Sequence, residues 1–507
     1  MTAKAIAVLG TGSDVGKSLI AAGLCRLIVR AGLRVAPFKA QNMSLNSFVT
    51  PEGGEIGRAQ ALQAEACRLL PHVDMNPILL KPESDRRSQV VVLGKVMARL
   101  EAAEYFDGRQ QLWKAVQDSY ARLAAQYDVI VIEGAGSAAE VNLRERDLVN
   151  WPVVTLADAG VLLVADIDRG GVFAQIIGTL DLLQPEERAR VRGVIINKFR
   201  GDAALFDDGV RFLETRTGIP VFGVVPFLRD LVLAQEDSLG PALQRQRPYS
   251  GDAVNIAVVL LPSMSNFTDF NLLQAEPDVV LRYVSAPRDL SQADVVIIPG
   301  SKNTLEDLRY LRKMGFAEAL RQQVEDGVEV VGICGGYQIL GEQIRDPRSV
   351  ESGGVEQGLG FLAVETELQE QKTLTLVQGR PLQPSLGVDV RISGYEIHMG
   401  VTLPKRPVQH CFLLCATQPP QSAEAHTWRD GAMNNTGMVW GTYVHGVFDH
   451  ASYRRAWLNR IRLRKDLEVV PVSVSESVTD RFDCEIDRWA DHLAVHIPLA
   501  SLGLLSR

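Results

Sequence analysis

Residues 330–341 read Val-Val-Gly-Ile-Cys-Gly-Gly-Tyr-Gln-Ile-Leu-Gly, which places a thiol between glycines, after an apolar run and before an apolar-periodic one. This order predicts a strand, a tight turn and a helix. A nucleophile on such a turn needs small neighbours, because the backbone must bend sharply. The first turn of the following helix offers unpaired N–H groups and a positive dipole end, which favour a thiolate and an oxyanion. The pattern therefore indicates that Cys334 is a nucleophile; the alternative, a buried structural cysteine, would not need the three glycines.

The composition is that of a soluble globular protein. The chain has 507 residues, of which 22% are charged and 46% hydrophobic, and its length suggests roughly three domains or two large ones. A net charge of −8 argues against a nucleic-acid partner. Six scattered cysteines indicate a reducing compartment, and no apolar stretch reaches the length of a membrane span. We therefore expect a cytoplasmic protein with no membrane partner.

A phosphate-binding loop follows the first predicted strand, residues 5–9. Residues 10–18 read Gly-Thr-Gly-Ser-Asp-Val-Gly-Lys-Ser and precede a helical run. Glycines let backbone N–H groups wrap phosphates, Lys17 offsets phosphate charge, and the Ser18 hydroxyl is a magnesium ligand. A glycine-rich turn that binds nothing is the alternative. The residues that we expect to bind ATP here are Gly12, Asp14, Gly16, Lys17 and Ser18.

The loop is longer than the common pattern, since five residues separate Gly10 from Gly16 where four are usual. In this it resembles the loop of dethiobiotin synthetase and its relatives. That resemblance implies that ATP phosphorylates a carboxylate-like group.

Polar residues follow the buried strands predicted downstream of this loop. Lys39 follows the strand at 34–38 and is placed to meet a transferring phosphoryl group, although a plain loop lysine is the alternative. Glu133 follows the strand at 129–132 and is the second candidate magnesium ligand beside Ser18, with a solvated strand-end carboxylate as the alternative. Asn197 follows the strand centred on 194–196 and suits reading of the nucleotide base. Strands alternating with helices predict a doubly wound, mostly parallel α/β domain.

A second α/β core follows a polar linker broken by proline and glycine. Its buried strands are expected at 254–261, 279–284, 295–298 and 328–333. We expect an ATP-binding domain at 1–233, the linker at 234–252, a second domain at 253–450 and a helical extension at 451–507.

Longer motifs make the chain resemble one family closely. They include Phe-Lys-Ala-Gln-Asn-Met at 38–43, Met-Asn-Pro-Ile-Leu-Leu-Lys-Pro at 75–82, Ala-Asp-Ile-Asp-Arg-Gly-Gly-Val-Phe at 165–173, Ser-Asn-Phe-Thr-Asp-Phe at 265–270 and Gly-Tyr-Glu-Ile-His-Met-Gly at 394–400. The chain resembles the cobyric acid synthase family over nearly its whole length. The resemblance implies a class I glutamine amidotransferase domain and a dethiobiotin synthetase-like ATP domain. It implies amidation of the b, d, e and g carboxylates of adenosylcobyrinic acid a,c-diamide, with glutamine, ATP and Mg²⁺.

A thiolate nucleophile needs a base, for which His445 is the best candidate, because it ends a short strand within a motif of that family. His398 is the runner-up. Class I glutamine amidotransferases usually carry His-x-Glu, but Val447 stands in the glutamate position. The third member is therefore open, with Asp449 or backbone groups as candidates. We expect the backbone N–H groups at 299–301 to complete the oxyanion hole.

Other proteins share this two-domain plan. The earlier cobyrinate a,c-diamide synthase and cytidine triphosphate synthase combine the same two activities, and the latter should carry the glutamate that Val447 replaces. A switch ATPase usually carries an extra lysine early in its loop, where this chain has Thr11 and Gly12. A scaffold protein with an inactive elbow is the remaining alternative.

Overall fold

The computed structural model describes residues 3–83, 87–101, 109–229, 231, 233, 246–417, 427–472 and 478–498. The chain forms two compact units, one of Met1–Ser44, Gly54–Ser238 and Arg481–Arg507, the other of Leu45–Gly53 and Leu239–Asp480. This division differs from the linear one that we expected. A short segment of the N-terminal half lies in the second unit, and the end of the chain lies in the first. Residues 234–245 of the expected linker lie outside the described residues.

The first unit is built on a six-stranded parallel sheet with the order β12-β11-β10-β1-β9-β2. Its strands are β1 (Lys4–Gly10), β2 (Val35–Phe38), β9 (Val129–Glu133), β10 (Gly160–Asp166), β11 (Val191–Phe199) and β12 (Val221–Pro226). These strands are formed by the apolar runs of the sequence, because a parallel sheet covered on both faces has no solvated side. The doubly wound fold that the sequence predicted is confirmed.

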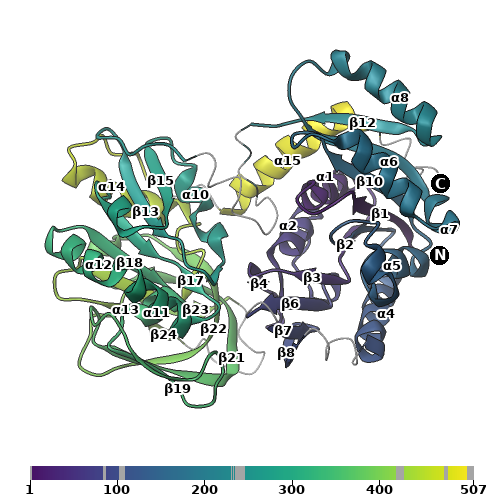
Figure 1. Cartoon of the computed structure of the whole chain (residues 1–507). Helices are drawn as coiled ribbons and strands as arrows, with labels where there is room; N and C mark the ends of the chain where they lie inside the picture. The colour runs from purple at the N-terminus through teal and green to yellow at the C-terminus, as the bar shows by residue number, and fades with distance from the viewer. Residues whose placement is uncertain are drawn as a thin grey trace. The chain divides into compact units, whose positions relative to one another are not determined.

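Helices cover both faces of this sheet (Figure 1). On β1, Ile6 and Val8 face the core that includes α1 and α15, whereas Ala7 and Leu9 face the core that includes α4 and α6. The helices are α1 (Lys17–Arg30), α2 (Arg58–Ala66), α4 (Arg109–Gln126), α5 (Trp151–Leu156), α6 (Val172–Leu182), α7 (Pro185–Arg188), α8 (Asp207–Thr217) and α15 (Val478–His496), with 3₁₀ turns η1 (Val73–Met75), η2 (Val141–Arg146) and η3 (Ala203–Phe206).

The C-terminal helix α15 belongs to this first unit from Arg481 onward. Figure 1 shows it in yellow beside the purple α1. Trp489 is buried and its indole N–H donates to the Leu19 carbonyl at 2.6 Å. The fully buried Arg26 of α1 pairs with Asp487 at 2.9 Å and with Asp483. A tail some 450 residues distant from α1 in sequence therefore completes its packing.

A small second sheet, β3-β6-β7-β8, accompanies the large one in the first unit. Its strands are β3 (Gln41–Met43), β6 (Ile78–Pro82), β7 (Arg87–Val92) and β8 (Lys95–Glu101), and β5 (Glu55–Gly57) lies next in the chain after the excursion to the second unit. Lys81 of β6 and Glu55 form a buried ion pair at 2.7 Å. Both charges are compensated, which burial requires.

The second unit holds a sheet of order β15-β13-β16-β18-β26-β25, parallel except for β25. Its strands are β13 (Val254–Val259), β15 (Val279–Val284), β16 (Val295–Ile298), β18 (Glu329–Ile333), β25 (Ala432–Met433) and β26 (Val439–Thr442); the helices are η4 (Phe267–Phe270), α10 (Asn271–Gln274), η5 (Pro287–Leu290), α11 (Thr304–Lys313), α12 (Phe316–Glu325), α13 (Gly335–Leu340), η6 (Pro384–Leu386) and α14 (Ala451–Arg464). Tyr453, Trp457 and Ile461 of α14 are buried in this core.

A mostly antiparallel sheet built on the long hairpin of β21 and β22 packs in the same unit. Its strands are β19 (Gln343–Asp346), β20 (Gly354–Gln357), β21 (Val364–Pro381), β22 (Ile392–Pro404), β23 (Phe412–Ala416), β24 (Thr427–Asp430) and β27 (Val444–His445), and the unit also contains β4 (Ser47–Val49) and the pair β14 (Met264–Ser265) and β17 (Gly300–Ser301). β27 pairs with β22, which places Tyr395 opposite His445. Within the described ranges, no helix is both long and apolar enough to cross a membrane.

Candidate active sites

The loop between β1 and α1 has the shape that phosphate binding requires. Gly16 has a φ of 97° and Asp14 a φ of 59°, both in the left-handed region. These backbone angles turn successive N–H groups toward one side of the loop. The Lys17 ammonium donates to the carbonyls of Gly12 at 2.8 Å and Gly136 at 3.1 Å, so the side chain lies back along the loop.

Asn197 lies against the outside of the same loop. Its amide nitrogen donates to the Val15 carbonyl at 2.9 Å. A Cβ atom on Gly16 would lie 2.2 Å from that nitrogen, so only glycine fits there. The Asp14 carboxylate pairs with Arg169 at 3.2 Å. Asn197 thus braces the phosphate loop; its role in reading the nucleotide base stays a prediction.

Glu133 is the point at which Ser18 and Lys39 meet. Its Oε1 atom accepts from the Ser18 hydroxyl at 2.7 Å and from the Lys39 ammonium at 2.7 Å. Burial raises the pKa of Glu133, but the charge of Lys39 and the hydrogen bonds more than offset this, so the pKa lies below its ordinary value. The carboxylate is therefore ionised at neutral pH.

Buried amides hold the other oxygen of this carboxylate, a feature that the sequence analysis missed. Gln60 and Gln63 both donate to Glu133 Oε2, and Gln60 in turn accepts from Asn42 at 3.1 Å. All three amide side chains are at least 97% buried. The motif that contains Asn42 was noticed in the sequence, but nothing in it indicated which group these amides orient.

The donor set around Glu133 fits magnesium. A hydroxyl and a carboxylate are hard oxygen ligands, and they lie within 2.7 Å of each other at the helix end of the phosphate loop. Lys39 bonds the same carboxylate oxygen of Glu133, so its ammonium group and a bound cation would both be attracted to that one negative charge. Among the described residues no group of three or more His, Cys, Asp or Glu side chains gathers as a metal site.

Cys334 lies on a strained turn at the end of β18. Its φ of 51° and ψ of −106° are rare for a residue with a side chain. A Cβ atom on Gly336 would lie 1.9 Å from the Ile298 carbonyl oxygen, and one on Gly335 would lie 2.8 Å from the Ser301 nitrogen. The glycines are thus required for close packing, and the strained turn has the geometry of a nucleophile elbow; the role of Cys334 as nucleophile stays a prediction.

The sheet brings His445 to Cys334. β18 and β26 are parallel neighbours with Ile333 opposite Thr442, so the residues that follow each strand meet at one edge. The Cys334 N–H donates to the Thr442 carbonyl at 2.8 Å. Gly300 lies beside the same histidine, since a Cβ atom there would be 3.0 Å from His445 Cε1. The oxyanion role of the backbone at 299–301 stays a prediction.

Asp269, rather than Asp449, is the carboxylate that holds His445. Its Oδ2 lies 2.7 Å from His445 Nδ1, and its Oδ1 accepts from the Gly446 N–H at 3.0 Å. Both His445 and Asp269 are buried. From the sequence, only Asp449 and backbone groups were candidates for this role. The motif at 265–270 contains Asp269, but nothing in it indicates a contact with a histidine 176 residues later.

The pKa values of the two histidines near the thiol are shifted in opposite directions. Burial lowers the pKa of His445, but the charges of Asp269 and Cys334 and the hydrogen bonds to both outweigh it and raise the pKa to about 10. Burial lowers the pKa of His398 to about 4. His398 donates through Nδ1–H to the Gly400 carbonyl oxygen at 2.7 Å and stacks on Tyr443. The geometry therefore favours His445 as the base.

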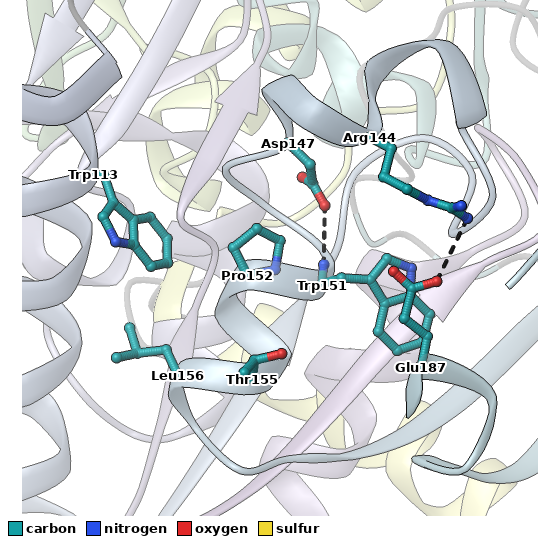
Figure 2. Close-up of a pocket in the computed structure, with 8 residues that line it drawn as sticks. All are labelled: Trp113, Arg144, Asp147, Trp151, Pro152, Thr155, Leu156 and Glu187. Atoms are coloured by element: carbon teal, nitrogen blue, oxygen red, sulfur yellow. Dashed lines mark hydrogen bonds and ion pairs between the residues drawn. The ribbon is translucent and has the colours of Figure 1, made fainter. Parts of the chain in front are cut away.

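A separate pocket of about 500 Å³ lies on the first unit (Figure 2). In it, Asp147 accepts from the Trp151 N–H at 3.0 Å, and Arg144 pairs with Glu187 at 3.5 Å. Its lining residues are Trp113, Arg144, Asp147, Trp151, Pro152, Thr155, Leu156 and Glu187. None of the expected ATP-binding or catalytic residues is among them, so the chemistry lies elsewhere.

Comparison with known proteins matches both halves of the chain. Residues 6–241 match the CobQ/CobB/MinD/ParA nucleotide binding domain, and residues 255–453 match the CobB/CobQ-like glutamine amidotransferase domain. Cobyric acid synthase of Klebsiella pneumoniae strain 342 is 50% identical, covering 99% of this chain and 98% of its own. That of Yersinia enterocolitica is 49% identical over 97% and 96%, and that of Syntrophobacter fumaroxidans 47% over 98% and 97%.

These relatives cover between 97% and 99% of the chain. The chain therefore belongs to the cobyric acid synthase family.

Proposed function

We propose that this chain is an ATP- and glutamine-dependent ligase of cobalamin biosynthesis that amidates the b, d, e and g carboxylates of adenosylcobyrinic acid a,c-diamide. One observation carries the proposal: each compact unit contains one complete set of groups for half of the reaction. The first unit joins Ser18, Lys39 and Glu133, and the second joins Cys334, His445 and Asp269. The relatives support the substrate by their name.

The second unit liberates the nitrogen. The Cys334 thiolate attacks the side-chain amide carbon of glutamine, and the backbone N–H groups beside the elbow hold the oxyanion. His445 delivers a proton to the departing nitrogen, so ammonia leaves and a thioester remains. Asp269 holds the ring and stabilises its charged form, since it bonds Nδ1. Water then attacks the thioester, His445 takes its proton, and glutamate leaves.

The first unit activates the acid. The corrin carboxylate attacks the γ-phosphorus of ATP, ADP leaves, and an acyl phosphate forms; ammonia then displaces phosphate and gives the amide. Lys17 and Lys39 offset the negative charge of the phosphoryl group. Ser18 and Glu133 would hold Mg²⁺, which supplies further charge neutralisation at the phosphates. We include a cytoplasmic location in this proposal, because the six scattered cysteines indicate a reducing compartment.

Mass spectrometry of the corrin product tests the proposed function. Purified protein given adenosylcobyrinic acid a,c-diamide, ATP, Mg²⁺ and glutamine should add four amides, each of which replaces one hydroxyl by an amino group. A parallel assay with UTP separates it from cytidine triphosphate synthase, and a parallel assay with cobyrinic acid separates it from the a,c-diamide synthase. An unchanged a,c-diamide would refute the assignment.

Two variants test the division of labour. Cys334→Ala should abolish the use of glutamine but leave amidation with added ammonium. Lys17→Ala should abolish amidation with either nitrogen source, because no acyl phosphate forms. Loss of both activities in Cys334→Ala would contradict two separate centres.

A further inference from the structure

A segment of the N-terminal half forms part of the second unit. The chain leaves the ATP-binding unit after Ser44 and returns to it at Gly54. Between these points, Val49 of β4 is fully buried and packs with Tyr395 and Ile397 of β22. Three consecutive residues of this segment, Asn46, Ser47 and Phe48, contact the surroundings of His445. Ser47 and Phe48 contact side chains that touch the imidazole, and Asn46 contacts the turn that contains Asp269.

The first connection runs through the turn that carries Asp269. The Asn46 side-chain oxygen accepts from the Phe267 N–H at 3.1 Å. Phe267 is the first residue of η4, and Asp269 lies two residues later with its carboxylate on His445 Nδ1. Asn46 is 98% buried, so its hydrogen bond is shielded from water. It therefore fixes the start of the turn that aims the carboxylate.

The second connection fixes the direction of an amide. The Ser47 N–H donates to Asn266 Oδ1 at 2.9 Å, and Asn266 Nδ2 lies 3.2 Å from His445 Nε2. Because the Asn266 oxygen already accepts from Ser47, the amide presents its N–H₂ group to the histidine. When the ring is neutral, His445 Nε2 accepts from this N–H₂ group and the ring proton lies on Nδ1, which donates to Asp269. Asn266 has a left-handed φ of 52°, a conformation that asparagine tolerates better than most residues.

The third connection is a stack of rings. The Phe48 ring meets the edge of Tyr395, with centroids 4.9 Å apart and planes at 63°. Tyr395 is stacked on the imidazole of His445 at 5.4 Å and 21°. Such contacts favour one ring position over others. Phe48 thus limits the tilt of the imidazole through Tyr395.

We propose that Asn46, Ser47 and Phe48 are positioning residues of the glutaminase centre, supplied by the N-terminal half of the chain to hold the base His445. The proposal deepens the proposed function and rests only on its glutaminase half. Each of the three residues restrains a different contact of one imidazole: its Nδ1 partner, its Nε2 partner and its face. A base works only when its lone pair points at the proton that it takes. Displacement of the imidazole by a few tenths of an ångström therefore lowers the reaction rate.

The segment lies close in sequence to residues of the ATP-binding unit. Lys39, which bonds the magnesium-site carboxylate, precedes Asn46 by seven residues. β3 before the segment and β5 after it belong to the ATP-binding unit. The residues on both sides of the segment that holds the glutaminase base therefore belong to the other unit.

Matched pairs of variants in the full-length protein test the proposal. Asn46→Ala removes the acceptor, whereas Asn46→Asp keeps an oxygen there. Ser47→Pro removes the N–H, whereas Ser47→Ala retains it. Glutamate release is the first readout, and corrin amidation driven by ammonium is the second. We expect Asn46→Ala and Ser47→Pro to lower kcat for glutamine at least about tenfold below their partners, with KM little changed and the ammonium reaction within about twofold of wild type.

The pH profile of glutamate release separates positioning from plain packing. In Ser47→Pro the Asn266 amide is free to turn its oxygen to His445 Nε2, which stabilises the protonated ring, so the inflection of the profile moves to higher pH. The titratable groups that face the ring are Asp269 on η4, Cys334 on the elbow, and Glu396 and His398 on β22, and all remain in the variant.

Three results would overturn the proposal: equal glutamine rates within each pair, an unshifted pH profile in Ser47→Pro, or parallel loss of the glutamine and ammonium reactions. If Ser47→Pro fails to fold, the Asn46 pair decides. Failure of the proposed function is recognised separately, because wild-type protein would then release glutamate from glutamine without modifying the corrin substrate.

Discussion

At the scale of single residues, Asp269 holds His445, which we propose as the base of the glutaminase centre. It bonds Nδ1 of His445 at 2.7 Å, from a turn 176 residues earlier in the chain. That separation explains why the sequence did not reveal it. The expected position two residues after the histidine holds Val447, and a carboxylate contributed by another element has no fixed spacing for a pattern to detect. The nucleophile, by contrast, was predicted from its flanking glycines alone.

Replacement of Asp269 by asparagine should remove most of the glutaminase activity. Without the carboxylate the imidazole loses its orientation and the stabilisation of its charged form, so glutamate release should fall roughly 10²–10⁴-fold. The pKa of His445 should also fall, because the charge that raises it is gone. Steady-state kinetics across pH measures both effects. Asp449→Asn is the matched control; a larger loss there than in Asp269→Asn would contradict the assignment.

His398 should make the native state sensitive to mild acid. Its pKa is lowered from 6.5 to about 4, so between these values the unfolded chain binds a proton that the folded one does not. Its contribution to stability is therefore complete above pH 6.5 and is lost as the pH falls toward 4. The variant His398→Asn retains a donor for the Gly400 carbonyl but cannot titrate. Between pH 7.5 and pH 5, wild type should therefore lose up to about 2 kcal/mol more free energy of unfolding than the variant. Solvent screening of the partly exposed ring makes this difference an upper bound. Urea unfolding at the two pH values measures the difference, and equal losses would contradict it.

At the scale of elements, the strand-turn-helix of β18 and α13 depends on contacts that a sequence pattern only suggests. The pattern predicts glycines for a sharp bend. The structure adds that Gly336 lies against the backbone of the neighbouring strand β16, at Ile298. Buried strands were predictable because their apolar runs are continuous, and the phosphate loop because its residues are adjacent. The amides that hold Glu133 were not, since they come from separate elements.

An alanine at Gly336 should therefore damage the second unit. Its Cβ atom would meet the Ile298 carbonyl at 1.9 Å, and the backbone must move apart at a cost of about 1–3 kcal/mol. Glutamate release should be lost because Cys334 moves with the turn. Gly178→Ala in α6 is the control, since nothing lies within 4 Å of the added atom and helix propensity favours alanine by about 0.5–1 kcal/mol. Chemical unfolding of both variants checks the contrast, which equal stabilities would disprove.

At the scale of the whole molecule, the sequence predicts two α/β units but not which segments each contains. The boundary near residue 234 follows from composition, whereas the crossings after Ser44, Gly53 and Asp480 do not. β4 has three residues, and α15 has the amphipathic pattern of any surface helix. Local pattern identifies an element, but the core that the element joins is decided by packing, for which a single sequence carries no local signal.

ATP should stabilise the protein through the first unit. A ligand that binds only the native state raises the free energy of unfolding, by about 2.7 kcal/mol at one hundred times its Kd. We expect thermal unfolding with MgATP to show this shift and Lys17→Ala to lack it. Lys114→Ala, which changes an exposed lysine on α4, should respond as wild type does. A full shift in Lys17→Ala would mean that the nucleotide binds elsewhere.

Because residues 45–53 belong to the second unit, recombination that divides the gene between its two halves would remove part of that unit. If recombination separated a gene for the C-terminal half from the rest, its product would lack β4, and Val49 would no longer cover Tyr395 and Ile397. That apolar strip would face water beside a histidine with fewer restraints. The C-terminal half alone would therefore lack a strand that covers part of its own core.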